Sequence, residues 1–246
     1  LNKIKEIDDK RIPHWYPPHK MMNVEDDSKP WGAEWREGRN FRTVAELFTK
    51  RNLWALAAIK NGTLSLNVDQ NLKDSLLFSL QGILLINSRM CRAETTQTQS
   101  GTYYIPAIFK ELVSINSVST KVRTISEAQS ELILSSTNFM ISNESVQALS
   151  LLPNSVDYIF TDPPYAGNVQ YGELNFIWEA WLDFDTNWHD EEIIVNEIRG
   201  KTLDDWARDM RKAMSECFRV LKPGRAISLC YHDTSEGTWA LVQDIM

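Results

Sequence analysis

The stretch that decides the fold of this chain is Ser155-Val156-Asp157-Tyr158-Ile159-Phe160-Thr161-Asp162-Pro163-Pro164-Tyr165. Its first half, Val156 to Phe160, is rich in β-branched and aromatic residues and predicts a buried strand. Two consecutive prolines then remove two backbone N–H donors and fix φ, so neither a helix nor a strand ladder continues through them. We therefore expect Asp162 at the carboxyl end of a buried strand, the edge at which open α/β sheets bind ligands.

The residues after the strand combine hydrogen-bond acceptors with a flat ring. Asp162 offers a carboxylate, the carbonyl groups of Asp162 and Pro163 are held rigid, and Tyr165 offers an aromatic face. The carboxylate and a proline carbonyl can accept both N–H bonds of an exocyclic aromatic amine, and a ring can stack on a base that has left its duplex. The pattern indicates a site for the amino group of a nucleobase. The alternative is a strand-ending turn with a chance aspartate.

The sequence around this motif resembles a known family. Asp162-Pro163-Pro164-Tyr165 after an apolar strand is similar to the catalytic motif of the DNA amino-methyltransferases, which use S-adenosylmethionine to methylate adenine N6 or cytosine N4. Upstream, residues 143–157 resemble the family's segment from an acidic strand end to Leu-Pro and Ser-Val-Asp. Downstream, residues 218–224 and 226–231 resemble its next helix, turn and strand. The likeness covers about Phe139 to Met246, and its motifs follow one another in the family's order.

The resemblance implies a fold class and a set of site residues. The fold would be α/β, with a partial Rossmann-like methyltransferase sheet preceded by a mainly helical region. Asn143 and Glu144 stand where the family usually has Gly and Asp. The implied catalytic residues are Asp162, Pro163, Pro164 and Tyr165, the implied cofactor-binding residues are Asn143, Glu144, Ser145 and Asp162, and the implied substrate-binding residues are Tyr165, Asn168 and Tyr171, with Gln170 on the same loop.

The implied activity is that of a site-specific DNA methyltransferase of the restriction-modification type. It would transfer a methyl group from S-adenosylmethionine to the exocyclic amine of a flipped DNA base, and aspartate as the first letter of the motif favours adenine N6. Bonds from the amine to Asp162 and the Pro163 carbonyl would draw its nitrogen toward sp³ geometry, ready for an in-line transfer. Cytosine N4, RNA and protein glutamine are alternative substrates. A further alternative is an inactive, cofactor-free subunit that acts as a binding module.

One expected feature of the family is missing from the sequence. Its cofactor site uses a glycine-rich turn after the first strand, whereas the ten glycines of this chain form no Gly-x-Gly. We expect this turn, the remaining strands and the target-recognition surface to lie outside these residues or on another subunit. The chain thus resembles a segment of a larger DNA methylase, and residues 1–246 alone are expected to bind S-adenosylmethionine weakly or not at all.

Composition limits the partners and the compartment. The 246 residues carry a formal net charge of -7. A protein that binds DNA without a partner normally has a basic surface that contacts the phosphates. We therefore expect the main DNA-reading surface elsewhere. Cys91, Cys217 and Cys230 form no Cys-x-x-Cys pair, so neither a disulfide framework nor a metal site is predicted. These thiols, the charged N-terminus and the lack of a long apolar run favour a soluble cytoplasmic protein without a membrane span.

The pattern along the chain changes near residue 131. Residues 1–130 are expected to form a mainly helical region with an irregular, proline- and tryptophan-rich arm, and residues 131–246 a partial methyltransferase catalytic domain. A capping box at Thr43–Glu46 predicts a helix that ends at Asn61-Gly62. Two further helices are expected over Leu72–Arg92 and within Pro106–Leu132.

In the second region strands alternate with helices, which indicates a parallel α/β sheet. The expected strands are Leu132–Leu134, Phe139–Ser142, Tyr158–Thr161 and Ala226–Tyr231. The expected helices run over Glu173–Phe184, from Thr202 to a stop at Lys222-Pro223-Gly224, and from Ser235 onward.

Overall fold

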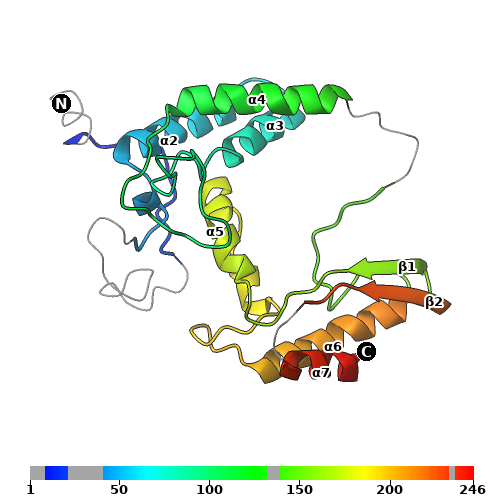
Figure 1. Ribbon diagram of the computed structural model, residues 1–246. Helices are drawn as coiled ribbons and strands as arrows, with labels where there is room; N and C mark the ends of the chain where they lie inside the picture. The colour runs from blue at the N-terminus through cyan, green and yellow to red at the C-terminus, as the bar shows by residue number, and fades with distance from the viewer. Residues whose placement is uncertain (1–8, 22–40, 132–138, 233–235) are drawn as a thin grey trace. The chain divides into compact units, whose positions relative to one another are not determined.

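The computed structural model describes residues 9–21, 41–131, 139–232 and 236–246. It divides into two compact units (Figure 1). The first, called here the helical unit, contains Leu1–Ser135 and Gly172–Asn187, and the second, the sheet unit, contains Ser136–Tyr171 and Trp188–Met246. The division expected from the sequence kept residues 131–246 together. The segment that begins at Gly172 instead joins the helical unit, because its apolar side chains are part of that unit's core.

The helical unit, in its described residues, is built from a 3-10 turn and four helices. These are η1 (Ala45–Leu47), α2 (Lys50–Ser65), α3 (Gln70–Gln81), α4 (Ser114–Glu131) and α5 (Tyr171–Leu182). Thr49 caps α2 by accepting a hydrogen bond from the Asn52 N–H at 3.2 Å, and Asp69 caps α3 in the same way. The fully buried side chains of its core include Leu47, Leu56, Leu84, Ile177 and Trp181.

The first predicted helix begins later than expected. The Glu46 N–H donates to the Thr43 hydroxyl at 3.4 Å, so the capping contact exists, but it supports only the short turn η1. Phe48 is extended, and its ring packs edge-on against Trp181 with the ring centroids 5.5 Å apart. The chain therefore leaves the helical conformation to make this contact, and α2 begins anew at Lys50.

The ends of the next helices also differ from the prediction. α2 continues through Gly62, where nothing crowds the backbone, because a single glycine costs a helix only about 1 kcal/mol. α3 ends at Gln81, before the predicted end at Arg92, and the chain continues in turns whose apolar side chains enter the core. The helix expected within Pro106–Leu132 is confirmed as α4.

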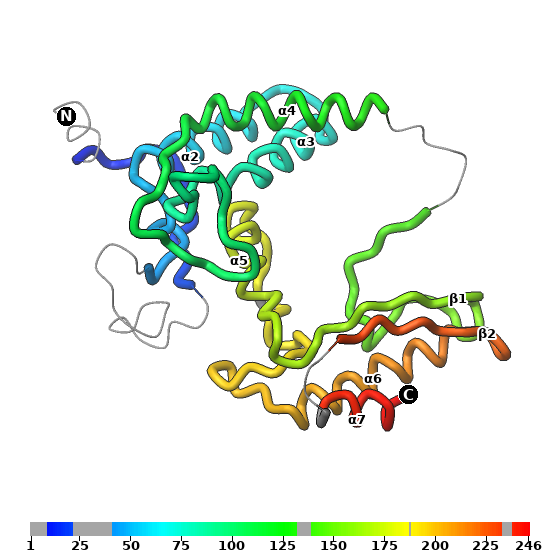
Figure 2. The backbone as a smooth tube through the Cα atoms, in the orientation of Figure 1, coloured from blue at the N-terminus to red at the C-terminus, as the bar shows by residue number. Residues whose placement is uncertain are grey.

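The sheet unit is organised by two strands, β1 (Val156–Thr161) and β2 (Leu221–Leu229), which pair in parallel. Parallel pairing requires a long crossover connection, and Figure 2 traces it from β1 through α5 and α6 (Leu203–Val220). α6 and α7 (Glu236–Ile245) cover one face of the strands (Figure 1). The mixed α/β class predicted from the sequence is confirmed in the described residues.

In the described residues, two of the four predicted strands are present. The strands expected at Tyr158–Thr161 and Ala226–Tyr231 correspond to β1 and β2, and β2 begins earlier than predicted. The expected burial of β1 is wrong, since Tyr158 and Phe160 are 55% and 67% exposed. The prediction at Phe139–Ser142 is wrong, since this stretch is irregular and its first three side chains are 74%, 76% and 88% exposed. An apolar run forms a strand only where a neighbour accepts its backbone hydrogen bonds. The strand expected at Leu132–Leu134 lies outside the described residues.

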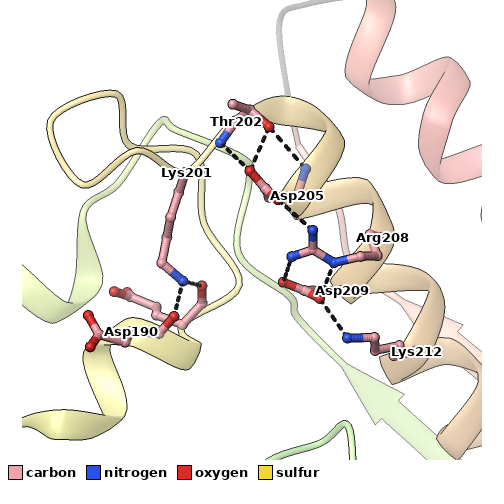
Figure 3. A network of polar contacts seen from close by, with 8 residues as sticks. Asp190, Lys201, Thr202, Asp205, Arg208, Asp209 and Lys212 are labelled. Carbon is pink, nitrogen blue, oxygen red and sulfur yellow. Dashed lines mark hydrogen bonds and ion pairs between the residues drawn. The ribbon is translucent and has the colours of Figure 1, made fainter.

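The capping box predicted at the start of α6 is confirmed. The Asp205 N–H donates to Thr202 Oγ1 at 3.2 Å, and the Thr202 N–H donates to the Asp205 carboxylate at 3.0 Å. Arg208 and Lys212 extend this network to Asp209 (Figure 3). The network fixes where α6 begins, and therefore which side chains on its apolar face reach the core.

That core brings α6 together with α7 and the loop after β1. Its buried residues are Ala166, Trp206, Ala207, Met210 and Val242. α6 ends at Val220, just before the predicted stop signal, and β2 follows without a loop. Among the helices of the described residues, none combines the length and the apolar character that a membrane span requires.

Replacing Trp206 by alanine should destabilise the protein by about 3–5 kcal/mol, because a fully buried indole is lost and a cavity remains. Phe218→Ala is the matched control on the same helix, since Phe218 is 83% exposed, and its effect should stay within about 0.5 kcal/mol. Urea unfolding followed by circular dichroism measures both. Equal losses for the two variants would contradict the core position of Trp206.

Candidate functional site

The candidate site lies where the chain leaves the two parallel strands. The Cys230 N–H donates to the Thr161 carbonyl at 2.9 Å, which extends the pairing one step beyond β2. Asp162 follows β1 directly and is exposed, while Pro163 is buried. Tyr231 follows β2 at the same edge, because the carboxyl ends of parallel strands lie together.

A hydrogen bond joins the first and last residues of the Asp-Pro-Pro-Tyr motif. The Tyr165 hydroxyl donates to Asp162 Oδ1 at 2.6 Å. This bond, together with the repulsion that a phenolate would feel from the carboxylate, raises the pKa of Tyr165 to about 12. In the described part of the chain, Asp162 Oδ2 and the Pro163 carbonyl have no hydrogen-bond partner. Two acceptors on neighbouring residues therefore lack a donor from the protein and lie beside a neutral phenol.

A tight turn fixes the direction of Tyr165. The Ala166 N–H donates to the Pro164 carbonyl at 3.1 Å, and the Asn168 N–H donates to the Tyr165 carbonyl at 3.0 Å. Ala166 has a φ of 48°, a left-handed conformation that costs a residue with a Cβ roughly 1–2 kcal/mol. Its methyl group is buried in the core of the sheet unit, so packing maintains this conformation.

Gln170 fastens the loop after β1 to a second loop of the sheet unit. Its Nε2 donates to the carbonyls of Gly167 and Val195 at 3.2 and 3.1 Å, and its Oε1 accepts from Asn196 Nδ2 at 2.7 Å. The Val195 N–H also donates to the Ala166 carbonyl at 3.2 Å. A Cβ at Gly167 would lie 3.2 Å from the Val195 carbonyl oxygen, so the close approach favours glycine. Gln170 thus holds the loop after β1 against the loop at Val195 and Asn196.

Aromatic rings line the site beyond the motif itself. The edge of Tyr165 meets Tyr231, with centroids 5.3 Å apart and an angle of 80° between the rings. Tyr231 stacks on Trp239 at 5.8 Å and 21°, and Trp206 lies behind it at 6.4 Å. An electrostatic effect of Tyr171 is a minor contribution to the raised pKa of Tyr165. Among the predicted site residues, the structure joins Asp162 and Tyr165 by a hydrogen bond.

Sequence reasoning did not assign Tyr231 and Trp239 to the site. The sequence predicts Tyr231 as the last residue of a strand and indicates no role for Trp239. The signal for Tyr231 was present, because the residue after the second of two parallel strands belongs at the same edge as the residue after the first. Trp239 carries no such signal, since its approach depends on how α7 packs.

The residues expected to bind the cofactor form a separate turn. The Glu144 carboxylate accepts bonds from the Ser150 N–H and the Ser142 hydroxyl, both at 3.0 Å, and these bonds hold the pKa of Glu144 below its ordinary value. Ser145 Oγ accepts from the Gln147 N–H at 3.3 Å. In the described chain, none of Asn143, Glu144 and Ser145 has a hydrogen bond or an ion pair with the Asp-Pro-Pro-Tyr motif.

This turn is attached to the end of α6. Arg219 donates to the carbonyls of Leu149 and Leu151 at 3.0 and 2.9 Å, and the Leu149 N–H donates to the Glu216 carboxylate at 3.1 Å. These bonds link it to the helix end that precedes β2, whereas Asp162 follows the carboxyl end of β1. The predicted cofactor-binding residues and the predicted catalytic residues are thus anchored by different contacts.

In the described residues, no three His, Cys, Asp or Glu side chains gather as the ligands of a metal ion would. No family model, no curated protein and no solved structure matched this chain. The function is therefore inferred from the geometry of the Asp162–Tyr165 motif and the rings around it.

Replacing Asp162 by asparagine should lower the pKa of Tyr165 from about 12 toward its ordinary value of 10, because the hydrogen bond to the carboxylate is the largest cause of the raised pKa and a neutral amide accepts a weaker bond and does not repel the phenolate. The tyrosine ¹³Cζ resonance, assigned with Tyr165→Phe, follows this titration. The sign for stability follows from the raised pKa. The contact stabilises the folded state below pH 10 and loses this effect as the pH rises past about 12. An unchanged titration in Asp162→Asn would exclude the carboxylate as the cause.

Proposed function

We propose that the Asp162 site binds the exocyclic amine of a nucleobase and that the protein is a DNA amino-methyltransferase, acting on adenine N6. One observation carries the proposal. Two acceptors, Asp162 Oδ2 and the Pro163 carbonyl, lack a protein donor at the carboxyl edge of a parallel strand pair, beside aromatic rings. An aromatic amine has two N–H bonds and a flat ring, so its hydrogen-bonding pattern and shape complement this set.

The chemistry follows from what these acceptors do to the amine. Its lone pair is delocalised into the ring, which makes the nitrogen a poor nucleophile. Hydrogen bonds from both N–H groups to fixed acceptors favour a pyramidal nitrogen and direct the lone pair away from Asp162 and Pro163. Tyr165 keeps its proton at neutral pH and holds one oxygen of the Asp162 carboxylate, which leaves the other oxygen in a defined position for the amine.

S-adenosylmethionine would supply the methyl group of this reaction. The residues expected to hold it do not join the base site, because Asn143, Glu144 and Ser145 lie in a local turn that has no bond to the Asp162 motif. The chain also lacks a Gly-x-Gly turn. We therefore propose that further sequence or a second subunit holds the cofactor, and we derive no step through it. The Rossmann-like sheet of this enzyme class belongs to the same proposal, supported by the parallel pairing of β1 and β2.

The charges of the sheet unit support the proposal that this unit holds the base and that another part of the protein binds the DNA phosphates. In its described residues, every arginine and lysine has a carboxylate or carbonyl partner. These cations are Arg199, Lys201, Arg208, Arg211, Lys212, Arg219, Lys222 and Arg225. Cations that already have partners contribute less to the phosphate contacts that dominate duplex affinity. The unit is suited to holding a base, and the phosphates would be bound elsewhere.

A second candidate function is a binding module without methyl transfer. The separate turn of Asn143, Glu144 and Ser145 favours it, because the protein would then need no cofactor pocket. Both candidates use the Asp162 site, and they differ in whether a methyl group is transferred.

Asp162→Asn should lower methyl transfer to adenine-containing DNA on the order of 100-fold or more, because the amide replaces one of the two fixed acceptors with a group that also donates. The full-length protein is assayed with labelled S-adenosylmethionine. Asp157→Asn is the control, a carboxylate on the same strand that pairs with Lys222 and Arg225. Asp162→Asn with wild-type activity would refute the proposed chemistry. Transfer to none of DNA, RNA or protein would favour the binding module.

A further inference from the structure

Four aromatic side chains of the sheet unit form a continuous series, called here the aromatic row. Its members are Tyr165, Tyr231, Trp206 and Trp239. The inner end is anchored in the core, because Trp206 is fully buried. The outer end reaches solvent, because Trp239 is 46% exposed. Tyr231 is the common member of these contacts: it meets the buried Trp206, the exposed Trp239 and Tyr165, whose hydroxyl is bonded to Asp162.

The position of Tyr231 separates the two outer rings. Tyr165 meets it edge-on at 5.3 Å, and Trp239 stacks on it at 5.8 Å with 21° between the planes. Because Tyr231 separates Trp239 from Tyr165, these two rings would not stack on the same base. Its exposed surface offers a second stacking position, next to the one at Asp162.

The form of nucleic acid that suits this second position follows from geometry and charge. Bases in a duplex already stack on their neighbours, so only an unpaired, unstacked nucleotide can place its ring on a tryptophan. Because the cations of the sheet unit already have partners, stacking is the main contact expected at this position, ahead of phosphate contacts. Stacking on a tryptophan favours a splayed base over a base in a duplex.

We propose that Trp239, backed by Tyr231, stacks on the nucleotide that neighbours the target base in single-stranded DNA. The proposal rests on the function proposed above and names the form of substrate that this site takes. Trp239 positions the strand and takes no part in the chemistry at Asp162.

The test measures binding of a single-stranded oligonucleotide with 2-aminopurine beside one adenine to the whole chain, by quenching of the probe's fluorescence. Trp239→Leu should raise Kd roughly 5- to 150-fold, the usual range for loss of one base–aromatic stack. Trp239→Phe keeps a ring and should retain most of the affinity. Trp188→Leu is the control, because Trp188 is 43% exposed in the same unit but lies outside the row. Circular dichroism confirms that each variant is folded.

The outcomes separate this inference from the proposed function. Wild-type affinity in Trp239→Leu, equal losses in Trp239→Leu and Trp188→Leu, or equal affinity for the matching duplex would each overturn the stacking position. In all three cases loss of methyl transfer in Asp162→Asn would still uphold the function at Asp162. Conversely, weakened binding in Trp239→Leu with full methyl transfer in Asp162→Asn would support the stacking position and refute the chemistry.

Discussion

The parallel pairing of β1 and β2 is the interaction on which the candidate site depends. Parallel strands present both carboxyl ends at one edge, and the bond from the Cys230 N–H to the Thr161 carbonyl continues the pairing up to that edge. Asp162 and Tyr231 emerge there from segments far apart in the sequence. Without this pairing, the ring of Tyr231 would have no reason to meet Tyr165, and the aromatic row would not form.

The site is supported by contacts that hold its backbone in place. Ala166 keeps a strained left-handed conformation because its methyl group is buried against α6 and α7, and Gln170 fastens the same loop to Val195. The capping box at Thr202 sets the start of α6 and thereby the position of Trp206 under this loop. A rigid loop suits a site whose task is to hold an amine in one orientation, because loose acceptors would not favour a pyramidal nitrogen.

The same unit is much less suited to a cofactor or a duplex. Glu144 stabilises its own turn through Ser142 and Ser150, and each cation of the described sheet unit already has a carboxylate or carbonyl partner. Both facts agree with the proposed function, in which this unit would hold the base and other sequence or a second subunit would hold the methyl donor and the phosphates. This explanation links the local charge pairing to the net charge of -7, which is unusual for a protein that binds DNA unaided.

The sequence by itself determined those features that depend on neighbouring residues. An apolar run ended by two prolines defines β1 and places Asp162 after it, and Thr202 with Asp205 defines the start of α6. Tertiary structure decided the features that depend on distant partners. Phe48 is extended because Trp181 packs against it, the apolar run at Phe139 forms no strand because no neighbour pairs with it, and Trp239 reaches Tyr231 only through the packing of α7. Local patterns record propensity and capping, whereas strand pairing and ring contacts arise between segments whose approach no local pattern encodes.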